Sequence, residues 1–140
     1  MSNGEFIVII DDDEDDRDVL RDVFQSLAIR KELVFFESSN EAYNFLMSTT
    51  AKPFLIICDI NLPRMNGIEL KRKIDTTDYL RRKAIPFVFL TTADRDYTID
   101  EAYSATNLQG YFRKGVAMEE IKHTVQCIIS YWSAALHPTI

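Results

Sequence analysis

The sequence predicts an α/β protein built around a five-stranded parallel sheet with helices on both faces. Short apolar runs alternate with helical patterns along the chain, and this alternation is typical of α/β organisation. The first run, FIVII at residues 6–10, is apolar at every position, as expected for a strand that is covered on both faces. No linker, repeat or low-complexity segment interrupts the 140 residues, so we expect one domain.

The N-terminal half contains three expected strands. The strand at 6–10 precedes a helix whose apolar positions recur every three or four residues: Val19, Leu20, Val23, Phe24 and Leu27. A second strand is expected at 33–36, and Ser38 with Glu41 forms a capping box that predicts the start of the next helix. The third strand is expected at 54–58.

The C-terminal half continues the pattern. The turn-rich loop DINLPRMNG leads into a helix at about 65–82, which we expect to break near 76–77. Strands at 86–91 and 110–113 flank a helix at about 98–106. The last helix has a wide apolar stripe, made of Met118, Ile121, Val125, Ile128, Ile129 and Trp132.

These elements amount to five βα units. Right-handed crossovers between them give a doubly wound, flavodoxin-like (βα)5 sheet of order 2-1-3-4-5. We expect the single domain to have its core over about residues 5–130, with a helical extension to residue 140.

Charge and cysteine content exclude several classes of protein. The formal net charge is -6, and no basic cluster offsets the acidic run at 11–16, which argues against nucleic-acid binding. The chain has neither a signal-peptide pattern nor an apolar run near the roughly 20 residues of a membrane span, so a cytoplasmic protein is expected. Cys58 and Cys127 are too few for a disulfide framework, and we expect both to be reduced and buried.

Polar residues stand at the ends of four expected strands, where a doubly wound sheet places its ligand site. They are Asp11, Asp12, Asp59, Thr91, Thr92 and Lys114. Carboxylates about 4 Å apart repel by roughly 4 kcal/mol at an effective dielectric near 20, so a cation is expected among them. This oxygen-rich set suits Mg²⁺ or Mn²⁺. Zinc would require Cys or His ligands, and we expect His123 and His137 to be ordinary surface residues.

Four motifs occur in order at these strand ends: VIIDD, CDINLPRMNG, FLTT and GYFRK. They resemble the acidic pair, phosphoacceptor loop, switch threonine and invariant lysine of bacterial two-component response regulator receiver domains of the CheY-like type. The resemblance runs from Phe6 to the last helix. It implies a phosphoprotein of phosphorelay signal transduction and not a turnover enzyme, with self-catalysed phosphoryl transfer and slow autodephosphorylation as its only chemistry.

The resemblance also implies how the acidic residues act. Asp59 would be the phosphoacceptor and would take its phosphoryl group from a sensor histidine kinase. Asp12, Asp59 and the backbone carbonyl of Asn61 would bind Mg²⁺, while Asp11 would hold a metal-bound water. Phosphoryl transfer passes through a highly charged transition state, so positioning and positive charge do most of the catalysis.

The remaining site residues would bind and report the phosphoryl group. By the same resemblance, Thr91 and Lys114 would contact phosphoryl oxygens together with the backbone amides of Asn61 and Thr92. Thr91 would then be drawn inward and leave space for Tyr111 to rotate from exposed to buried. A change at the face formed by the helix at 98–106, the fifth strand and the last helix would follow.

No sequence remains after Ile140 for an output domain, so the resemblance implies a stand-alone receiver that signals to a downstream protein target. The end of the last helix, YWSAALHP, is similar to that of single-domain regulators paired with phytochrome-type kinases, and a homodimer through the face just described is an expected partner arrangement. Gly115 replaces the proline that usually follows the lysine, so we expect a trans peptide there.

Three alternatives remain open. Asp11 and Asp13 can be read as the DxD of a haloacid-dehalogenase-like Mg²⁺ hydrolase that forms an aspartyl phosphate, although Glu14 and Asp15 follow. A flavin-binding flavodoxin would need Ser, Thr and Gly after the first strand, where carboxylates stand. A degenerate receiver would be a constitutive protein-interaction module. We interpret most of the acidic residues at 13–16 as favourable charges at a helix start.

Overall fold

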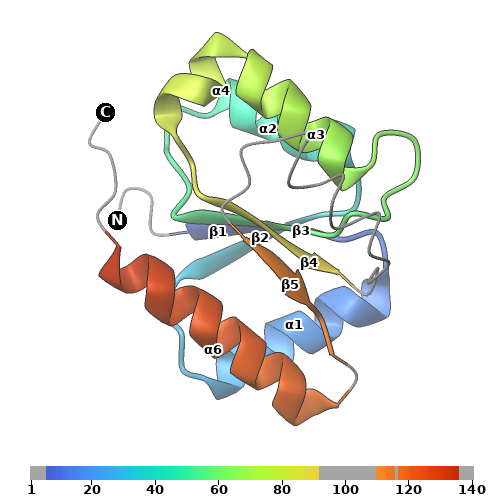
Figure 1. Cartoon of the computed structure of the whole chain (residues 1–140), viewed down its shortest axis with the longest axis vertical. Coiled ribbons are helices and arrows are strands. Elements are labelled where there is room, and N and C mark those ends of the chain that lie inside the picture. The colour runs from blue at the N-terminus through green and yellow to red at the C-terminus, as the bar shows by residue number, and fades with distance from the viewer. Residues whose placement is uncertain (1–5, 92–109, 116, 136–140) are drawn as a thin grey trace.

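Five parallel strands form one sheet in the order β2-β1-β3-β4-β5 (Figure 1). The computed structural model describes residues 6–91, 110–115 and 117–135. The strands are β1 (Phe6–Ile10), β2 (Glu32–Phe36), β3 (Leu55–Cys58), β4 (Phe87–Thr91) and β5 (Tyr111–Arg113). The strand order and the parallel pairing confirm the predicted doubly wound sheet.

Helices cover both faces of this sheet. Those in the described residues are α1 (Glu14–Ser26), α2 (Ser39–Ser48), α3 (Gly67–Thr76), α4 (Asp78–Lys83) and α6 (Met118–Ala134). Figure 1 shows α2, α3 and α4 on one side of the sheet and α1 with α6 on the other. Alternate residues of the strands point to opposite faces, so Val8 and Ile10 join the first hydrophobic cluster while Ile7 and Ile9 join the second.

The element boundaries agree closely with the predicted ones. The helix expected at 65–82 is divided at Thr77, whose extended backbone (φ -99°, ψ 112°) ends α3 and precedes α4. β2 begins at Glu32, one residue before the predicted start. It lies at the edge of the sheet and is only half-buried, so its apolar pattern marks its start less sharply. The helix expected at 98–106 lies outside the described residues.

Side-chain caps define where the helices begin. Asp13 is the N-cap of α1, and its Oδ1 accepts hydrogen bonds from the backbone N–H groups of Asp15 and Asp16. The Ser38 hydroxyl accepts one from the Glu41 N–H at 3.2 Å, which confirms the predicted start of α2. Acidic residues in a first turn interact favourably with the helix dipole, so part of the acidic run has a purely structural role.

Both cysteines were expected to be buried, and this prediction is right for Cys58 and wrong for Cys127. Cys58 is buried in β3, but Cys127 is exposed, because α6 turns Val125, Ile128 and Ile129 toward the sheet and Cys127 away from it. Trp132 is half-buried against the second cluster.

Among the described helices, none has both the length and the apolar character that crossing a membrane requires.

Candidate functional site

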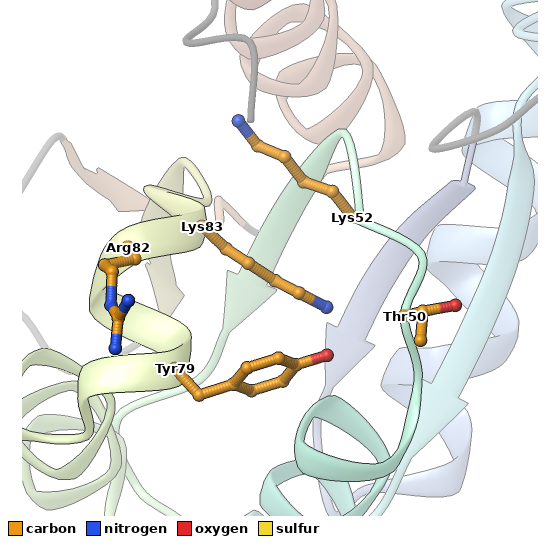
Figure 2. A pocket seen from close by; sticks show the side chains of 5 residues that line it. All are labelled: Thr50, Lys52, Tyr79, Arg82 and Lys83. Carbon is orange, nitrogen blue, oxygen red and sulfur yellow. The ribbon is translucent and has the colours of Figure 1, made fainter.

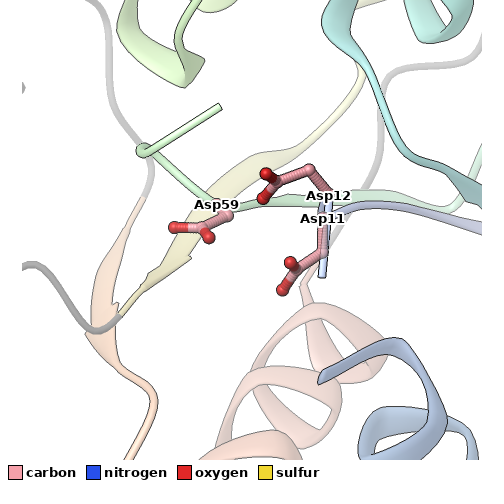
Figure 3. Close-up of side chains that lie close together, drawn as sticks. All are labelled: Asp11, Asp12 and Asp59. Atoms are coloured by element: carbon pink, nitrogen blue, oxygen red, sulfur yellow. The ribbon is translucent and has the colours of Figure 1, made fainter. Parts of the chain in front are cut away.

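Three carboxylates meet at the carboxyl-terminal edge of the sheet. Asp11 and Asp12 follow β1, Asp59 follows β3, and the Asp59 N–H donates to the Ile10 carbonyl at 2.9 Å. One oxygen from each carboxylate lies within 4.8 Å of the others (Figure 3). Asp11 is 2% and Asp59 9% exposed, whereas Asp12 is solvent-exposed. The cluster therefore combines two buried carboxylates with one that is open to solvent.

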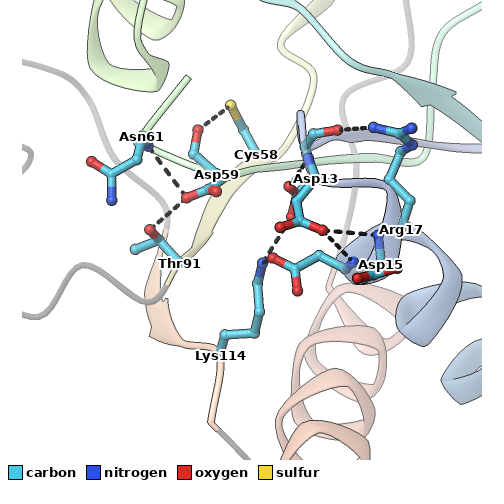
Figure 4. A network of polar contacts seen from close by, with 10 residues as sticks. Asp13, Asp15, Arg17, Cys58, Asp59, Asn61, Thr91 and Lys114 are labelled. Carbon is cyan, nitrogen blue, oxygen red and sulfur yellow. Dashed lines mark hydrogen bonds and ion pairs between the residues drawn. The ribbon is translucent and has the colours of Figure 1, made fainter. Parts of the chain in front are cut away.

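Asp59 is held on one side of its carboxylate. Its Oδ1 accepts a hydrogen bond from the Thr91 hydroxyl at 2.6 Å and a longer one from the Asn61 N–H at 3.3 Å (Figure 4). The Cys58 thiol donates to the Asp59 carbonyl at 3.1 Å. Burial raises the pKa of this thiol well above its usual 9.0, and the negative charges of Asp59 and Asp11 add to the shift. Cys58 therefore remains a neutral packing group beside the site.

Lys114 brings positive charge to the same edge. Its backbone N–H donates to the Thr91 carbonyl at 2.9 Å, which fixes it at the end of β5. Its Nζ donates to Asp11 Oδ2 at 2.8 Å and to Asp16 Oδ2 at 3.0 Å, and the residue is only 5% exposed. Burial alone would lower the pKa of Lys114, but the hydrogen bonds to Asp11 and Asp16 and the charges of Asp11 and Asp59 raise it overall. The ammonium is therefore held in its charged form.

The pKa of Asp11 shifts upward for a different reason. Burial raises it, and the hydrogen bonds from Lys114 and from the Asp13 N–H offset only part of that shift. Arg17 also donates to the Asp11 carbonyl at 2.8 Å and fixes the chain where β1 passes into α1. The Asp13 N–H and Lys114 Nζ therefore hold the Asp11 carboxylate, while Arg17 holds its backbone.

Asp16 is a site residue that the sequence reasoning missed, because the acidic run was interpreted mainly as helix-start charge. With Asp13 as N-cap, Asp16 is the third residue of α1, and side chains there point back toward the start of the helix. That geometry carries its carboxylate to Lys114, 98 residues further along the chain. The helix register after the N-cap is the signal that could have identified it.

Gly67 is a second residue that the sequence reasoning missed. A Cβ at this position would lie 2.5 Å from the Asp59 carbonyl oxygen and 3.0 Å from the Ile60 Cα, so α3 approaches the Asp59 backbone more closely than any side chain permits. Asn66 and Glu69 form a reciprocal capping box around this start of α3. The sequence pair Asn-Gly at the end of the loop was the available signal.

The residues expected to switch lie near the site. Thr91 is fully buried, and its hydroxyl is bonded to Asp59; the movement expected of it on phosphorylation stays a prediction. Tyr111 is half-buried, with its ring 6.1 Å from that of Phe89 in an edge-to-face arrangement; its rotation on phosphorylation stays a prediction. Thr92 lies outside the described residues.

The peptide after Lys114 is trans, since the described residues contain no cis peptide bond. This agrees with the expectation for a chain without proline there. Gly115 adopts a φ of +81°, the left-handed region that favours glycine. A side chain at this position would be strained, and its Cβ would lie 3.0 Å from the Glu120 Cβ.

The assembled geometry supports one type of chemistry. Oxygen ligands from neighbouring strand ends could hold a hard divalent cation, and the donor set matches what Mg²⁺ or Mn²⁺ prefers. A carboxylate beside that cation is a candidate nucleophile, while the Lys114 ammonium and the Thr91 hydroxyl offer positive charge and a hydrogen bond. The structure thus brings together Asp11, Asp12, Asp59, Thr91, Lys114 and the amide of Asn61; their individual roles stay predictions.

A comparison with protein families matches residues 7–126 to the response regulator receiver domain. Among curated proteins, the response regulator Rcp1 of Synechocystis sp. (strain ATCC 27184 / PCC 6803 / Kazusa) is 28% identical over 131 residues, which cover 90% of this chain and 87% of that protein. The probable methanogenesis regulatory protein FilR2 of Methanothrix harundinacea (strain 6Ac) is 27% identical over 130 residues, covering 90% of this chain and 82% of that protein.

Solved structures show the same architecture. The Mn(2+)-bound form of Rcp1 superposes with a TM-score of 0.82 at 26% identity, over 96% of this chain and 99% of that one. The phosphorylated cyanobacterial phytochrome response regulator RcpA superposes with a TM-score of 0.85 over the same shares, at 24% identity, and shows the fold alone.

Proposed function

This chain belongs to the response regulator receiver domain family, and we propose on that premise that Asp59 accepts a phosphoryl group from a sensor histidine kinase. The observation that carries the proposal is the convergence of the Asp11, Asp12 and Asp59 carboxylates within 4.8 Å beside a buried ammonium. Carboxylates this close repel one another unless positive charge offsets them, and a set of oxygen ligands suits a hard divalent cation such as Mg²⁺.

Asp59 is the proposed nucleophile. Hydrogen bonds from Thr91 and Asn61 to Oδ1 orient the carboxylate and leave Oδ2 without a hydrogen-bond partner among the described residues. Oδ2 attacks the phosphorus of a phosphohistidine, the P–N bond breaks, and its electron pair leaves with the imidazole nitrogen, which takes up a proton. A carboxylate nucleophile of this kind divides phosphoryl transfer into two easier steps.

Asp12, Asp59 and the carbonyl of Asn61 are the proposed ligands of Mg²⁺ or Mn²⁺, with Asp11 acting through a bound water. Such a cation offsets carboxylate repulsion and stabilises charge on the phosphoryl oxygens. The similarity to Rcp1, which has been solved in a Mn(2+)-bound form, supports this assignment. Lys114, now shared between Asp11 and Asp16, would exchange one of these partners for a phosphoryl oxygen.

Phosphorylation would change the charge and the contacts of the site. An aspartyl phosphate carries up to about two negative charges and three acceptor oxygens. Thr91 would transfer its hydrogen bond from the Asp59 carboxylate to a phosphoryl oxygen, with the Thr92 amide beside it, and Tyr111 would adjust its packing against Phe89. The output would pass to a downstream protein, with a homodimer through the face of the helix expected at 98–106, β5 and α6 as one form of the assembly.

Several finer parts of the proposal concern context. We place the chain as a single, cytoplasmic receiver domain that undergoes slow autodephosphorylation and no other turnover. Its likeness to RcpA, a cyanobacterial phytochrome response regulator, is the support for a partner kinase of the phytochrome type. Because the chain belongs to the receiver domain family, we no longer favour a haloacid-dehalogenase-like hydrolase or a flavodoxin. The complete set of site residues counts against a degenerate receiver.

Incubation with acetyl phosphate and Mg²⁺, followed by intact-mass measurement, tests this function. The wild-type protein should gain the mass of one phosphoryl group, and chelation of the metal should prevent it. Asp59→Asn should gain none. Asp13→Asn is the matched control, because asparagine still caps α1 and the residue lies outside the three-carboxylate cluster. Equal labelling of wild type and Asp59→Asn would exclude Asp59 as the acceptor.

A further inference from the structure

A pocket of about 430 Å³ lies at the edge of the sheet opposite the acidic cluster. It is bounded by the segment between α2 and β3 and by α4, and five residues line it: Thr50, Lys52, Tyr79, Arg82 and Lys83 (Figure 2). None of these residues belongs to the phosphoryl site. Its volume falls in the range of small-molecule sites, roughly 300 to 1,000 Å³.

Lys83 is the buried residue in the lining of this pocket. Its Nζ donates to the Thr49 carbonyl at 2.9 Å and to the Ala51 carbonyl at 3.0 Å. The Tyr79 hydroxyl donates to the same Thr49 carbonyl at 2.6 Å, and Thr49 is the C-cap of α2. These bonds therefore satisfy carbonyls at a helix end and attach α4 to α2. They use two of the three N–H donors of the ammonium.

The charge of Lys83 is not neutralised by these contacts. Lys83 is 8% exposed, and among the described residues neither it nor Arg82 has a carboxylate oxygen within the 4.0 Å of an ion pair. Buried charges are normally paired. The chain provides acidic partners elsewhere, as for Lys71, whose Nζ lies 2.6 Å from Asp75 Oδ1. A chain with a net charge of -6 thus places unneutralised positive charge around one hollow.

The other lining residues of the pocket suit a ligand that has an apolar body and one anionic group. The Tyr79 ring centroid lies 4.6 Å from Lys83 Nζ, and Figure 2 shows the ring side by side with the ammonium. Partial burial lowers the pKa of Lys52, so this side chain is also partly withdrawn from water. The two carbonyl oxygens beside Lys83 would repel a dianion, which favours a singly charged carboxylate over a phosphate.

A second hollow offers a contrast. It has a volume of about 440 Å³ and is lined by Arg113, Glu119, Glu120 and His123, among others. Two carboxylates in this hollow disfavour an anion. The two hollows are similar in size, but basic residues predominate only in the lining of the Lys83 pocket. The Lys83 pocket is therefore the better candidate for an anion site.

We propose that the pocket formed by Thr50, Lys52, Tyr79, Arg82 and Lys83 binds a small aromatic monocarboxylate. The carboxylate takes the third N–H of Lys83, the aromatic body lies along the Tyr79 ring, and Arg82 at the mouth attracts the anion. This binding does not depend on phosphorylation of Asp59.

Titration with 3-phenylpropionate, followed by amide chemical shifts of the ¹⁵N-labelled protein, tests the proposal. Saturable shifts should appear at residues 49–52 and 79–84 at concentrations up to about 10 mM. The neutral analogue 3-phenylpropanamide should bind at least about tenfold more weakly, because it cannot form a charge-assisted hydrogen bond. Lys83→Met should weaken binding of the acid by about tenfold.

Arg82→Gln covers the case in which Lys83→Met fails to fold, since Arg82 is exposed. It should weaken binding about threefold, as expected for a partly screened charge. Arg72→Gln removes the same charge from an exposed position of α3 and should leave affinity unchanged. Absence of shifts at the pocket with 3-phenylpropionate, equal affinity for the acid and its amide, or equal loss in Arg72→Gln and Arg82→Gln would each overturn the proposal.

Discussion

Two buried lysines at opposite edges of the same sheet differ in what surrounds them. Lys114 is 5% exposed and holds the carboxylates of Asp11 and Asp16, whereas Lys83 is 8% exposed and holds two backbone carbonyls. Both ammonium groups are hydrogen-bonded, but within the part of the chain that the structure describes only the charge of Lys114 has a carboxylate partner. The comparison teaches that the partners of a buried cation, more than its burial, determine which ligand it can attract.

Lys114→Met should produce the largest effect. Removing the ammonium leaves two carboxylates without their cation and takes one positive charge from the transition state. Loss of one such electrostatic contact typically costs about 100-fold or more in rate. The initial rate of phosphoryl uptake from acetyl phosphate, followed by intact mass, measures it. A rate within threefold of wild type would mean that Lys114 serves only stability.

Lys83→Met should affect stability and not phosphoryl transfer. The Ala51 carbonyl loses its donor, and the Thr49 carbonyl keeps only the Tyr79 hydroxyl; leaving a partly buried polar group unsatisfied costs about 1 to 3 kcal/mol. Denaturant unfolding should report a loss of about 2 kcal/mol in the free energy of unfolding. Phosphoryl uptake, measured on the folded variant, should stay within about twofold of wild type. Matching losses of uptake in the Lys83 and Lys114 variants would remove the distinction between the two edges.

Asp16→Asn should have a smaller effect, in the opposite direction on rate. The Asp16 side chain is 37% exposed, so its ion pair contributes less than about 1 kcal/mol to the free energy of unfolding. Lys114 would then be held by Asp11 alone and would reach a phosphoryl oxygen more readily, which should raise the rate of uptake about two- to threefold. A slower variant would show that Asp16 positions Lys114 instead of competing for it.

The smallest effect should appear at high pH. The pKa of Lys114 is raised above the ordinary 10.5 in the folded protein, so its ion pairs contribute fully to stability below pH 10.5 and lose that contribution as pH rises through the folded value. The difference in unfolding free energy between wild type and Lys114→Met should therefore narrow above pH 10.5. A difference that stays constant into this range would contradict the raised pKa.

The fold and the acidic edge were predictable because they depend on local patterns. Apolar runs identified β1 and β4, Thr77 marked the break between α3 and α4, and polar residues at strand ends identified the site. Helical periodicity also placed Cys127 opposite the apolar stripe of α6, but its residue type suggested burial. The position of Cys127 on the polar side of the helix indicated its exposure better than its residue type did.

The contacts that distinguish the two lysines were not predictable in this way. Lys83 ends the run RRK, which looks like solvated charge, and its burial depends on how α4 lies over the end of α2. The Lys114–Asp16 pair depends on the register of α1 and joins residues 98 apart. Both contacts form only in the tertiary structure: the register of α1 indicates the direction of the Asp16 side chain, but no local pattern indicates that Lys114 lies there.

The two thiols of the chain differ in accessibility, and this difference has an experimental use. Cys127 is exposed on α6, while Cys58 is fully buried in β3 immediately before Asp59. Iodoacetamide should alkylate Cys127 directly and Cys58 only when the central strand separates from its neighbours. The ratio of the two alkylation rates would then report how often the strand that leads to Asp59 opens, with Cys127 as an internal standard in the same molecule.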